Sequence, residues 1–287
     1  MLRSATTACI LCYLGTAAFA QPPAKVTIEK NVAYLPADRT EKADLYLPAD
    51  PPKGVLRPAV LIIHGGGWTG GDKGAAREIN IGTTLAEHGY VGLSINYALA
   101  AKGKPTWPQN LYDCKTAVRW LRKNAEKFHI DPERIGVIGG SAGGHLAAMV
   151  GLTGVADKLD PKEPYGEFSC KVRCAVDLYG PAELSEWHDL DMLGKTRAEA
   201  PELYKLASPT HYADKSDPPV LILHGTADKT VDLKQSEIFA AALKKAGVEH
   251  ELVVVKDAPH TFHLQPKQQD LRPVVLGFFD KHLKSAK

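Results

Sequence analysis

The sequence has 287 residues, of which 44% are hydrophobic and 24% charged, and its formal net charge is +2. This length and composition suit one large packed domain. The near-balance of charge excludes the strong basic field that nucleic-acid binding needs, so we expect no nucleic-acid partner. No apolar run approaches the roughly 18 residues of a membrane-spanning helix, so we expect no membrane partner either.

The first 20 residues have the features of an export signal. Arg3 supplies a positive charge, residues 8–17 are apolar, and Ala18-Phe19-Ala20 forms an A-x-A cleavage site. We therefore expect a signal peptide over residues 1–20, export to the periplasm or the medium, and one domain over residues 21–287.

Three cysteines follow the signal segment, namely Cys114, Cys170 and Cys174. Because their number is odd, at least one is unpaired within a monomer, while a bridge from Cys114 to either of the others stays open. After the signal segment, no Cys or His pair has the spacing of a zinc site such as C-x-x-C or H-E-x-x-H. We expect neither a metal nor another cofactor.

Short apolar runs alternate with helical periodicity along most of the chain. Residues 26–34 and 43–47 alternate around a polar turn, which predicts an antiparallel hairpin at a sheet edge. Further strands are predicted at 59–63, 90–95, 135–138, 174–178, 220–223 and 252–255, and helices at 75–88, 111–128, 144–152, 233–246 and 271–283. The pattern predicts an α/β fold: a mostly parallel, eight-stranded sheet with helices on both faces. Residues 181–212 show no clear strand and are predicted to form a small cap.

The most informative motif is Gly139-Gly140-Ser141-Ala142-Gly143, which lies between a predicted strand and a predicted helix. Flanking glycines allow the strained turn of a nucleophile elbow, which places a serine hydroxyl above a sheet at a helix N-terminus. A glycine-rich phosphate loop is the alternative, but the spacing fits neither G-x-G-x-x-G nor a Walker loop. We therefore predict that Ser141 is a nucleophile.

A second glycine motif, His64-Gly65-Gly66-Gly67-Trp68, follows the strand at 59–63. Successive glycines leave backbone N–H groups free to point at one oxygen, as an oxyanion hole requires. We predict that Gly66, Gly67 and Ala142 donate these N–H groups. A tight glycine turn is the alternative, and His64 is expected only to brace the loop.

The acid and the base of a triad are predicted on later loops. Asp228 follows the strand at 220–223, where a carboxylate can reach a histidine on the neighbouring loop. Asp232 is the near competitor, although it immediately precedes a predicted helix and suits its N-cap, and Asp177 is a more distant candidate. His260 follows the strand at 252–255 and is predicted to be the base, with His263 as a possible substitute. The predicted order is Ser, Asp, His.

These residues resemble the α/β-hydrolase esterases of the hormone-sensitive-lipase-like type, and more closely the bifunctional feruloyl and acetyl-xylan esterases. The resemblance covers most of the chain and is carried by the two glycine motifs, Gly71-Asp72-Lys73, Asn96-Tyr97, Tyr179-Gly180-Pro181, Ala207-Ser208-Pro209 and His224-Gly225 with Asp228. Two positions depart from the family. Val231-Asp232 stands where a Val-Pro is usual, which keeps Asp232 open, and Asp257-Ala258-Pro259 lacks the usual glycine before the histidine.

The resemblance implies an α/β-hydrolase fold and a serine ester hydrolase. Together with the export signal, it favours acetyl or feruloyl esters of plant polysaccharides, with Trp68, Tyr97 and the cap shaping the pocket. A general short-chain carboxylesterase, or an arylformamidase or small prolyl-type peptidase with the same triad, stays open. The alternative outside enzymes is an inactive hydrolase fold used for binding.

Overall fold

A computed structural model describes residues 25–49 and 54–284 of the chain. The predicted signal peptide at residues 1–20 lies outside the described residues. Among those that are described, no helix has the length and apolar character needed to cross a membrane.

Eight strands form one sheet, in the spatial order β1-β2-β4-β3-β5-β6-β7-β8. In chain order the strands are β1 (Thr27–Val32), β2 (Ala43–Leu47), β3 (Arg57–Ile63), β4 (Val91–Ile95), β5 (Ile130–Gly140), β6 (Ala175–Leu178), β7 (Val220–Gly225) and β8 (His250–Val255). β1 pairs with β2, and β2 with β4, in antiparallel fashion, while every other neighbouring pair is parallel. The edge hairpin and the mostly parallel sheet are therefore confirmed.

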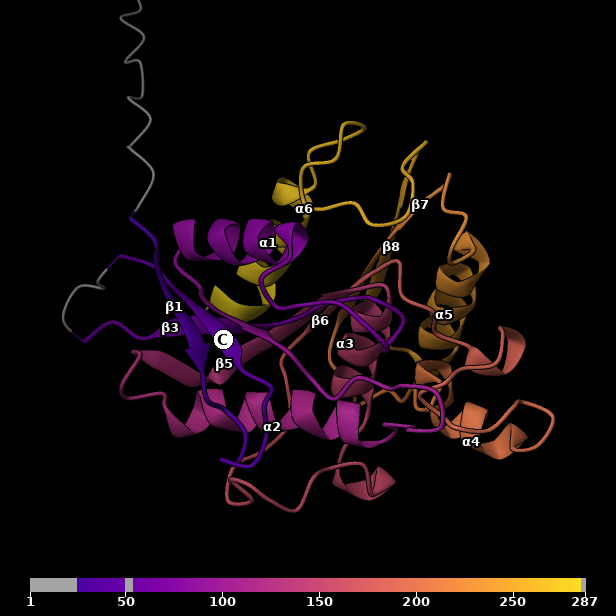
Figure 1. Cartoon of the computed structure of the whole chain (residues 1–287). Coiled ribbons are helices and arrows are strands. Elements are labelled where there is room, and N and C mark those ends of the chain that lie inside the picture. The colour runs from indigo at the N-terminus through magenta and orange to yellow at the C-terminus, as the bar shows by residue number, and fades with distance from the viewer. Residues whose placement is uncertain (1–24, 50–53, 285–287) are drawn as a thin grey trace, which may run out of the picture.

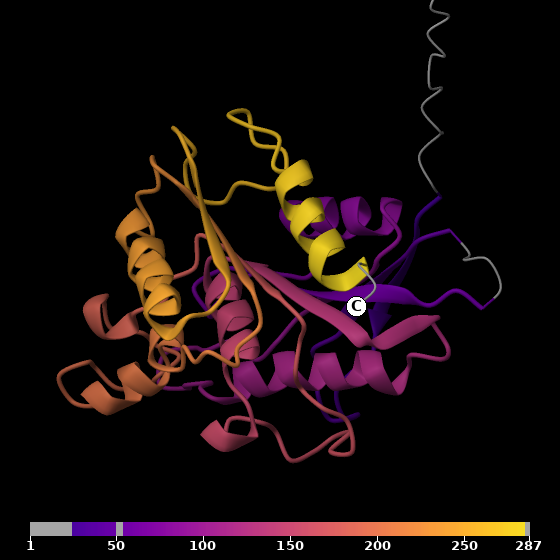
Figure 2. The same ribbon diagram turned by 180° about the vertical axis from the view of Figure 1, so that it is seen from behind.

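Helices cover both faces of this sheet. They are α1 (Ala76–Glu87), α2 (Gln109–Lys123), α3 (Ala142–Leu152), α4 (Pro201–Leu206), α5 (Leu233–Ala246) and α6 (Arg272–Phe279). Figures 1 and 2 show α1 and α6 on one face and α2 and α3 on the other. A separate apolar core lies on each face of the sheet. On one face, Ile81 of α1 and Phe279 of α6 pack with residues of β6 and β7. On the other face, apolar residues of α2 and α3 pack against the sheet. Phe239 and Leu243 of α5 join α3 and β7 in a third cluster.

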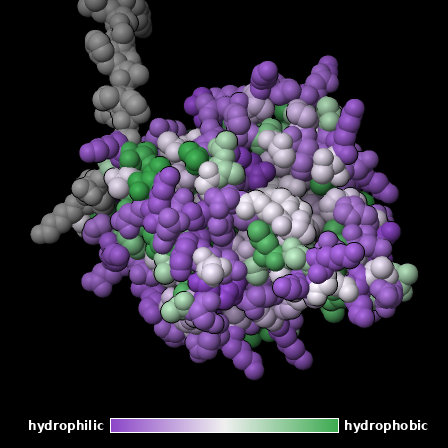
Figure 3. All heavy atoms as spheres, in the orientation of Figure 1, coloured by the Kyte–Doolittle hydropathy of each residue, from purple (hydrophilic) through white to green (hydrophobic). Residues whose placement is uncertain are grey.

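The apolar residues are mainly interior. β3, β4, β6 and β7 are buried nearly throughout, while the edge strand β1 is mostly exposed. Figure 3 shows one face of the molecule, on which hydrophilic residues surround a central patch of intermediate and hydrophobic ones. Burial of continuous apolar strands between two helical layers supplies the main stabilisation of such a fold.

Several element boundaries differ from the predicted ones, and two of the differences have clear local reasons. β5 begins at Ile130 because Arg57 pairs with Ile130, although the polar residues 131–134 interrupt the apolar pattern. α2 ends at Lys123 rather than at Phe128, and the Asn124 side chain donates to the Trp120 carbonyl oxygen at 2.9 Å. Side chains that compete with the backbone in this way favour a helix end.

The three described cysteines are free and buried. Cys114 lies in the core on the α2 side of the sheet, whereas Cys174 lies in the core on the α1 and α6 side. The bridge that the sequence left open from Cys114 is therefore not formed, and the sheet itself separates Cys114 from Cys174.

Residues 181–212, the predicted cap, contain α4 and two short 3-10 helices. The segment is tied to the loop before α2, because the Met192 carbonyl oxygen accepts from the N–H groups of Thr106 and Trp107 at 3.0 Å each. Within it, the Tyr204 hydroxyl accepts from the Leu190 N–H at 2.8 Å and donates to the Lys195 carbonyl oxygen at 2.9 Å.

Candidate active site

Ser141 occupies a strained turn between β5 and α3. Its φ of 59° and ψ of −124° lie outside the conformations that non-glycine residues favour. The glycines near Ser141 cannot be replaced by larger residues. A Cβ on Gly139 would lie 2.1 Å from the Gly143 carbonyl oxygen, and a Cβ on Gly143 would lie 2.1 Å from the Ile63 carbonyl oxygen. This strand-turn-helix is the geometry expected of a nucleophile elbow, and it holds the serine at the N-terminus of α3.

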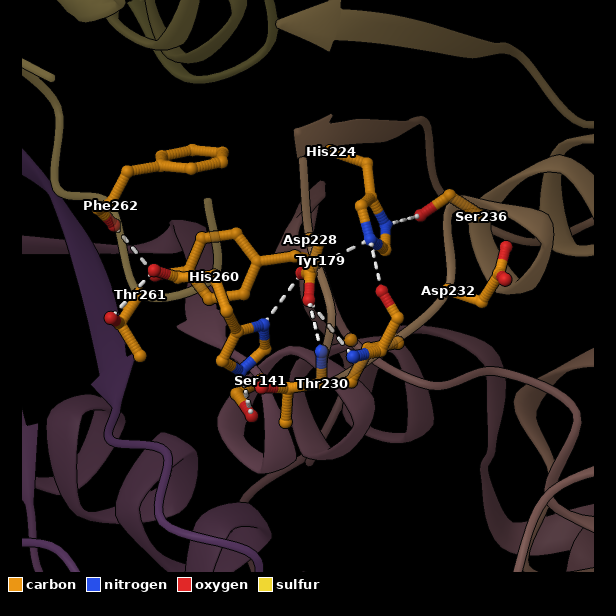
Figure 4. A network of polar contacts seen from close by, with 12 residues as sticks. Ser141, Tyr179, His224, Asp228, Thr230, Asp232, Ser236, His260, Thr261 and Phe262 are labelled. Carbon is orange, nitrogen blue, oxygen red and sulfur yellow. Dashed lines mark hydrogen bonds and ion pairs between the residues drawn. The ribbon is translucent and has the colours of Figure 1, made fainter. Parts of the chain in front are cut away.

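His260 connects Ser141 to Asp228 (Figure 4). Its Nε2 lies 2.9 Å from Ser141 Oγ, and its Nδ1 lies 2.6 Å from Asp228 Oδ2. Because an ionised carboxylate only accepts hydrogen bonds, Nδ1 carries the proton and Nε2 is left to accept from the serine hydroxyl. The three side chains, 119 and 32 positions apart in sequence, therefore form one hydrogen-bonded chain.

Asp228 is the carboxylate that meets the histidine, and the competing acids serve other groups. The Asp232 side chain accepts from the Lys234 N–H at 2.9 Å and caps α5. Asp177 accepts from the Gly180 N–H at 2.8 Å through Oδ1, and no described residue pairs with its Oδ2. His263 Nδ1 accepts from the N–H of Gln265 at 2.9 Å, and no hydrogen bond from His263 to Ser141 or Asp228 is found among the described residues.

The glycine loop lies directly against the elbow. A Cβ on Gly65 would be 2.6 Å from the Gly140 carbonyl oxygen and 3.1 Å from Ser141 Cβ. Gly66 and Gly67 have positive φ values of 116° and 61°, which glycine adopts without steric cost. No acceptor for the N–H groups of Gly66, Gly67 or Ala142 is found among the described residues. These three groups are thus available to an oxygen beside Ser141.

His64 and Tyr97 brace this loop from behind. Their rings stack with centroids 4.4 Å apart, and the Tyr97 hydroxyl donates to the His64 carbonyl oxygen at 2.9 Å. His64 Nδ1 lies 2.7 Å from the Gly65 carbonyl oxygen, and burial lowers the pKa of His64. His64 thus has the bracing position expected of it. Tyr97 is 1% exposed, so it supports the loop and offers little surface to a substrate.

Trp68 has a similar position, although the sequence suggested a place in the substrate pocket. Its side chain is also 1% exposed, and its Nε1 donates to His145 Nδ1 at 3.3 Å. His145 Nε2 in turn donates to the Ala207 carbonyl oxygen at 2.7 Å, and burial lowers the pKa of His145 to about 4. Trp68 therefore ties the glycine loop to α3 and to the segment at 181–212, behind the surface that a substrate meets.

The loop that carries His260 is held by contacts that the sequence did not reveal. Asp257 and Thr261 have positive φ values, 58° and 66°, although neither is a glycine. The Tyr179 hydroxyl donates to the Phe262 carbonyl oxygen at 2.6 Å, and the Tyr179 ring packs edge-on against His260 with centroids 4.8 Å apart. These contacts hold the loop although the glycine usual in the resembled family is absent.

Behind Tyr179 lies an ion pair from α1. Arg77 donates to the Tyr179 hydroxyl at 3.0 Å and is fixed by Glu78 Oε1, 2.6 Å from its terminal nitrogen. The motif Tyr179-Gly180-Pro181 marked this region, but only the fold shows that Tyr179 meets Arg77, 102 positions away.

The site is built from side chains and backbone N–H groups of the chain itself. Among residues 25–49 and 54–284, no group of three or more His, Cys, Asp or Glu side chains is arranged to hold a metal ion. The arrangement can deliver a hydroxyl nucleophile, take up its proton and hold a negative oxygen. This combination suits acyl transfer.

Comparison with known proteins gives a consistent result. The family model BD-FAE matches residues 43–243. Esterase LipQ of Mycobacterium tuberculosis is 31% identical over 245 residues, which cover 82% of this chain and 57% of LipQ. The chain thus spans about half the length of this curated relative and of two further mycobacterial ones, at 48% and 55%.

Solved structures with the same fold cover nearly all of this chain. The truncated form of a carbohydrate esterase from gut microbiota has a TM-score of 0.81 and 27% identity, covering 93% of this chain and 99% of that one. Butyrate-bound esterase 2 of Thermogutta terrifontis has a TM-score of 0.74 and 29% identity, covering 93% and 97%. The predicted α/β-hydrolase fold is confirmed.

Proposed function

Since the chain belongs to the BD-FAE family, we propose that it is a serine carboxylic-ester hydrolase. Ser141 is the nucleophile, His260 the general base and Asp228 the acid that orients the histidine. The observation that carries the proposal is the continuous hydrogen-bonded chain from Ser141 Oγ through His260 to Asp228. The strained elbow and the adjacent glycine loop support it, because both belong to the machinery of acyl transfer.

The geometry supports a two-step mechanism. Ser141 Oγ attacks the ester carbonyl carbon as His260 Nε2 takes the hydroxyl proton, and Asp228 stabilises the resulting imidazolium. The N–H groups of Gly66, Gly67 and Ala142 hold the oxyanion of the tetrahedral intermediate. The C–O bond to the alcohol then breaks, and His260 returns the proton to the leaving alcohol. Water repeats the sequence on the acyl-enzyme and releases the acid.

The substrate class that we propose is acylated plant polysaccharide, with acetyl or feruloyl as the acyl group. The likeness to a gut carbohydrate esterase supports this choice, as does the export signal predicted at residues 1–20. On the basis of that signal we also propose that the protein is secreted or periplasmic. A general short-chain carboxylesterase is the second candidate, favoured by the likeness to a butyrate-bound esterase.

The substrate class can be tested by measuring release of acetate from acetylated xylan and of ferulate from feruloylated arabinoxylan. The nitrophenyl esters p-nitrophenyl acetate and p-nitrophenyl butyrate serve as comparison substrates. We expect a higher kcat/KM, per ester group, on one of the polysaccharides than on either nitrophenyl ester. A Ser141→Ala variant serves as the blank, with turnover lower by several orders of magnitude. Turnover of the nitrophenyl esters alone would instead assign a general carboxylesterase.

A further inference from the structure

A second histidine reaches the carboxylate that orients His260. His224 lies in β7, four residues before Asp228, and its side chain is fully buried. Its Nε2 lies 3.3 Å from Asp228 Oδ2 and 2.9 Å from the Val231 carbonyl oxygen. Its Nδ1 lies 2.7 Å from Ser236 Oγ on α5, as Figure 4 shows.

These contacts determine the tautomer of His224. A carbonyl oxygen only accepts, so the contact with Val231 places the ring proton on Nε2. Burial lowers the pKa of His224, so the ring is neutral at pH 7 and Nδ1 accepts from the Ser236 hydroxyl. The N–H at Nε2 is therefore shared between the Val231 carbonyl oxygen and Asp228 Oδ2.

Asp228 is consequently held from four directions. Its Oδ1 accepts from the N–H groups of Thr230 at 2.8 Å and Val231 at 2.9 Å, and its Oδ2 faces both His260 and His224. An ionised carboxylate has about four acceptor sites, so these donors fill its capacity and prevent its rotation. The side chain is 1% exposed, so water does not replace a missing donor readily.

We propose that His224 is a positioning residue of the triad, a neutral donor that fixes Asp228 and, through it, the imidazole of His260. A neutral ring suits this role because a charged one would compete with His260 for the negative charge of Asp228. The inference rests on the proposed esterase function, and it adds His224 and Ser236 as a structural extension of the triad.

The charged and titratable groups near His260 define what a pH measurement would sense. They come from three places: Asp228 and His224 on and before the loop after β7, Tyr179 after β6, and Arg77 with Glu78 on α1 behind Tyr179. Among the residues that the structure describes, only His224 and the backbone N–H groups of Thr230 and Val231 share Asp228 with His260. A substitution of His224 thus changes the donor set of that carboxylate and leaves the Tyr179 side intact.

Two substitutions of His224 separate donation from simple space filling. His224→Leu removes the donor, whereas His224→Gln places an amide N–H near the position of Nε2 and cannot ionise. With p-nitrophenyl acetate we expect kcat to fall about tenfold or more in His224→Leu and to stay within about threefold in His224→Gln, with KM little changed. The midpoint of the acid limb of kcat/KM should rise by about half a pH unit in His224→Leu, because Asp228 then acts with fuller charge on His260.

Ser236→Ala tests the same chain of hydrogen bonds while leaving His224 in place. It tests the role of His224 if His224→Leu does not fold. It should lower kcat in the same direction by a smaller factor. Ser94→Ala is the matched control, since this buried serine also donates one hydrogen bond, to the Lys73 carbonyl oxygen at 2.8 Å, but does not contact the triad. Wild-type kcat and an unchanged pH midpoint in folded His224→Leu, or in Ser236→Ala if that variant alone folds, would overturn the proposal.

A readout other than activity separates this proposal from the esterase function. The His260 Nδ1 proton, bonded to Asp228 at 2.6 Å, should give a low-field proton NMR signal in the wild type. That signal should shift in His224→Leu and stay in place in Ser94→Ala. If the wild type hydrolysed no ester, the proposed function would fail while the NMR result still decided whether His224 positions Asp228.

Discussion

Two buried side chains next to the elbow, Asp177 and His145, respond to pH in opposite directions. Burial raises the pKa of Asp177 to about 7 and lowers that of His145 to about 4. Asp177, protonated more readily in the folded state, contributes stability below about pH 4, which is lost as the pH rises through 7. His145, protonated more readily when unfolded, contributes stability above about pH 6.5, which is lost as the pH falls through 4.

Replacing Asp177 by Asn should remove the first of these contributions. Asn keeps an oxygen for the Gly180 N–H but never ionises. The free energy of unfolding of Asp177→Asn, relative to wild type, should therefore increase between pH 4 and pH 8, by up to a few kcal/mol. Urea unfolding at both pH values measures this, with the exposed Asp38→Asn as control. An equal difference at the two pH values would contradict the account.

The candidate triad could be predicted residue by residue because each member follows an apolar strand. Ser141, Asp228 and His260 were all indicated by that rule, and Asp232 proved to be a helix cap. The role of His224 could not be predicted in this way. Its signal, four residues before Asp228, is visible in the sequence, but its contact with Ser236 depends on how α5 packs beside β7.

At the level of elements, the loop after β8 depends on Tyr179 for its position. Tyr179→Phe keeps the ring beside His260 but leaves the Phe262 carbonyl oxygen and Arg77 without the hydroxyl. We expect kcat/KM for p-nitrophenyl acetate to fall roughly tenfold and the free energy of unfolding to fall by about 1–2 kcal/mol.

Tyr90→Phe is the control for this change. Tyr90 is buried, and its hydroxyl donates to Asp280 at 2.6 Å, where it touches no triad residue. It should lose comparable stability and keep wild-type kcat/KM. If Tyr179→Phe also kept wild-type kcat/KM, the loop would not depend on this hydroxyl.

Strands and helices were mostly predictable because their apolar periodicity reflects burial by neighbouring layers. One exception is the first part of β5, where polar residues adopt regular structure because the backbone pairs with Arg57 at the start of β3. Another is the early end of α2 at Lys123. The placement of Trp68 and Tyr97 was also beyond a sequence pattern, since an aromatic residue beside a glycine loop can face the substrate or support the loop. Both are buried.

On the scale of the whole molecule, one sheet brings four distant segments to a single edge. β3, β5, β7 and β8 all run in parallel, so the loops that follow them carry the glycine motif, Ser141, Asp228 and His260 to their common carboxyl edge. The length of the chain and the alternation of apolar strands with helical segments predicted this architecture. The identity of the acyl group is not encoded in the architecture, because side chains on the surrounding loops determine which ester fits.

The most direct test of the account is covalent labelling of the intact, folded protein with a fluorophosphonate, followed by peptide mass spectrometry. We predict one adduct, on Ser141, absent from Ser141→Ala and formed much more slowly in His260→Gln, because the hydroxyl is activated through His260. Failure of the folded wild type to react, or an adduct on another residue with Ser141 unmodified, would contradict the assignment of the triad.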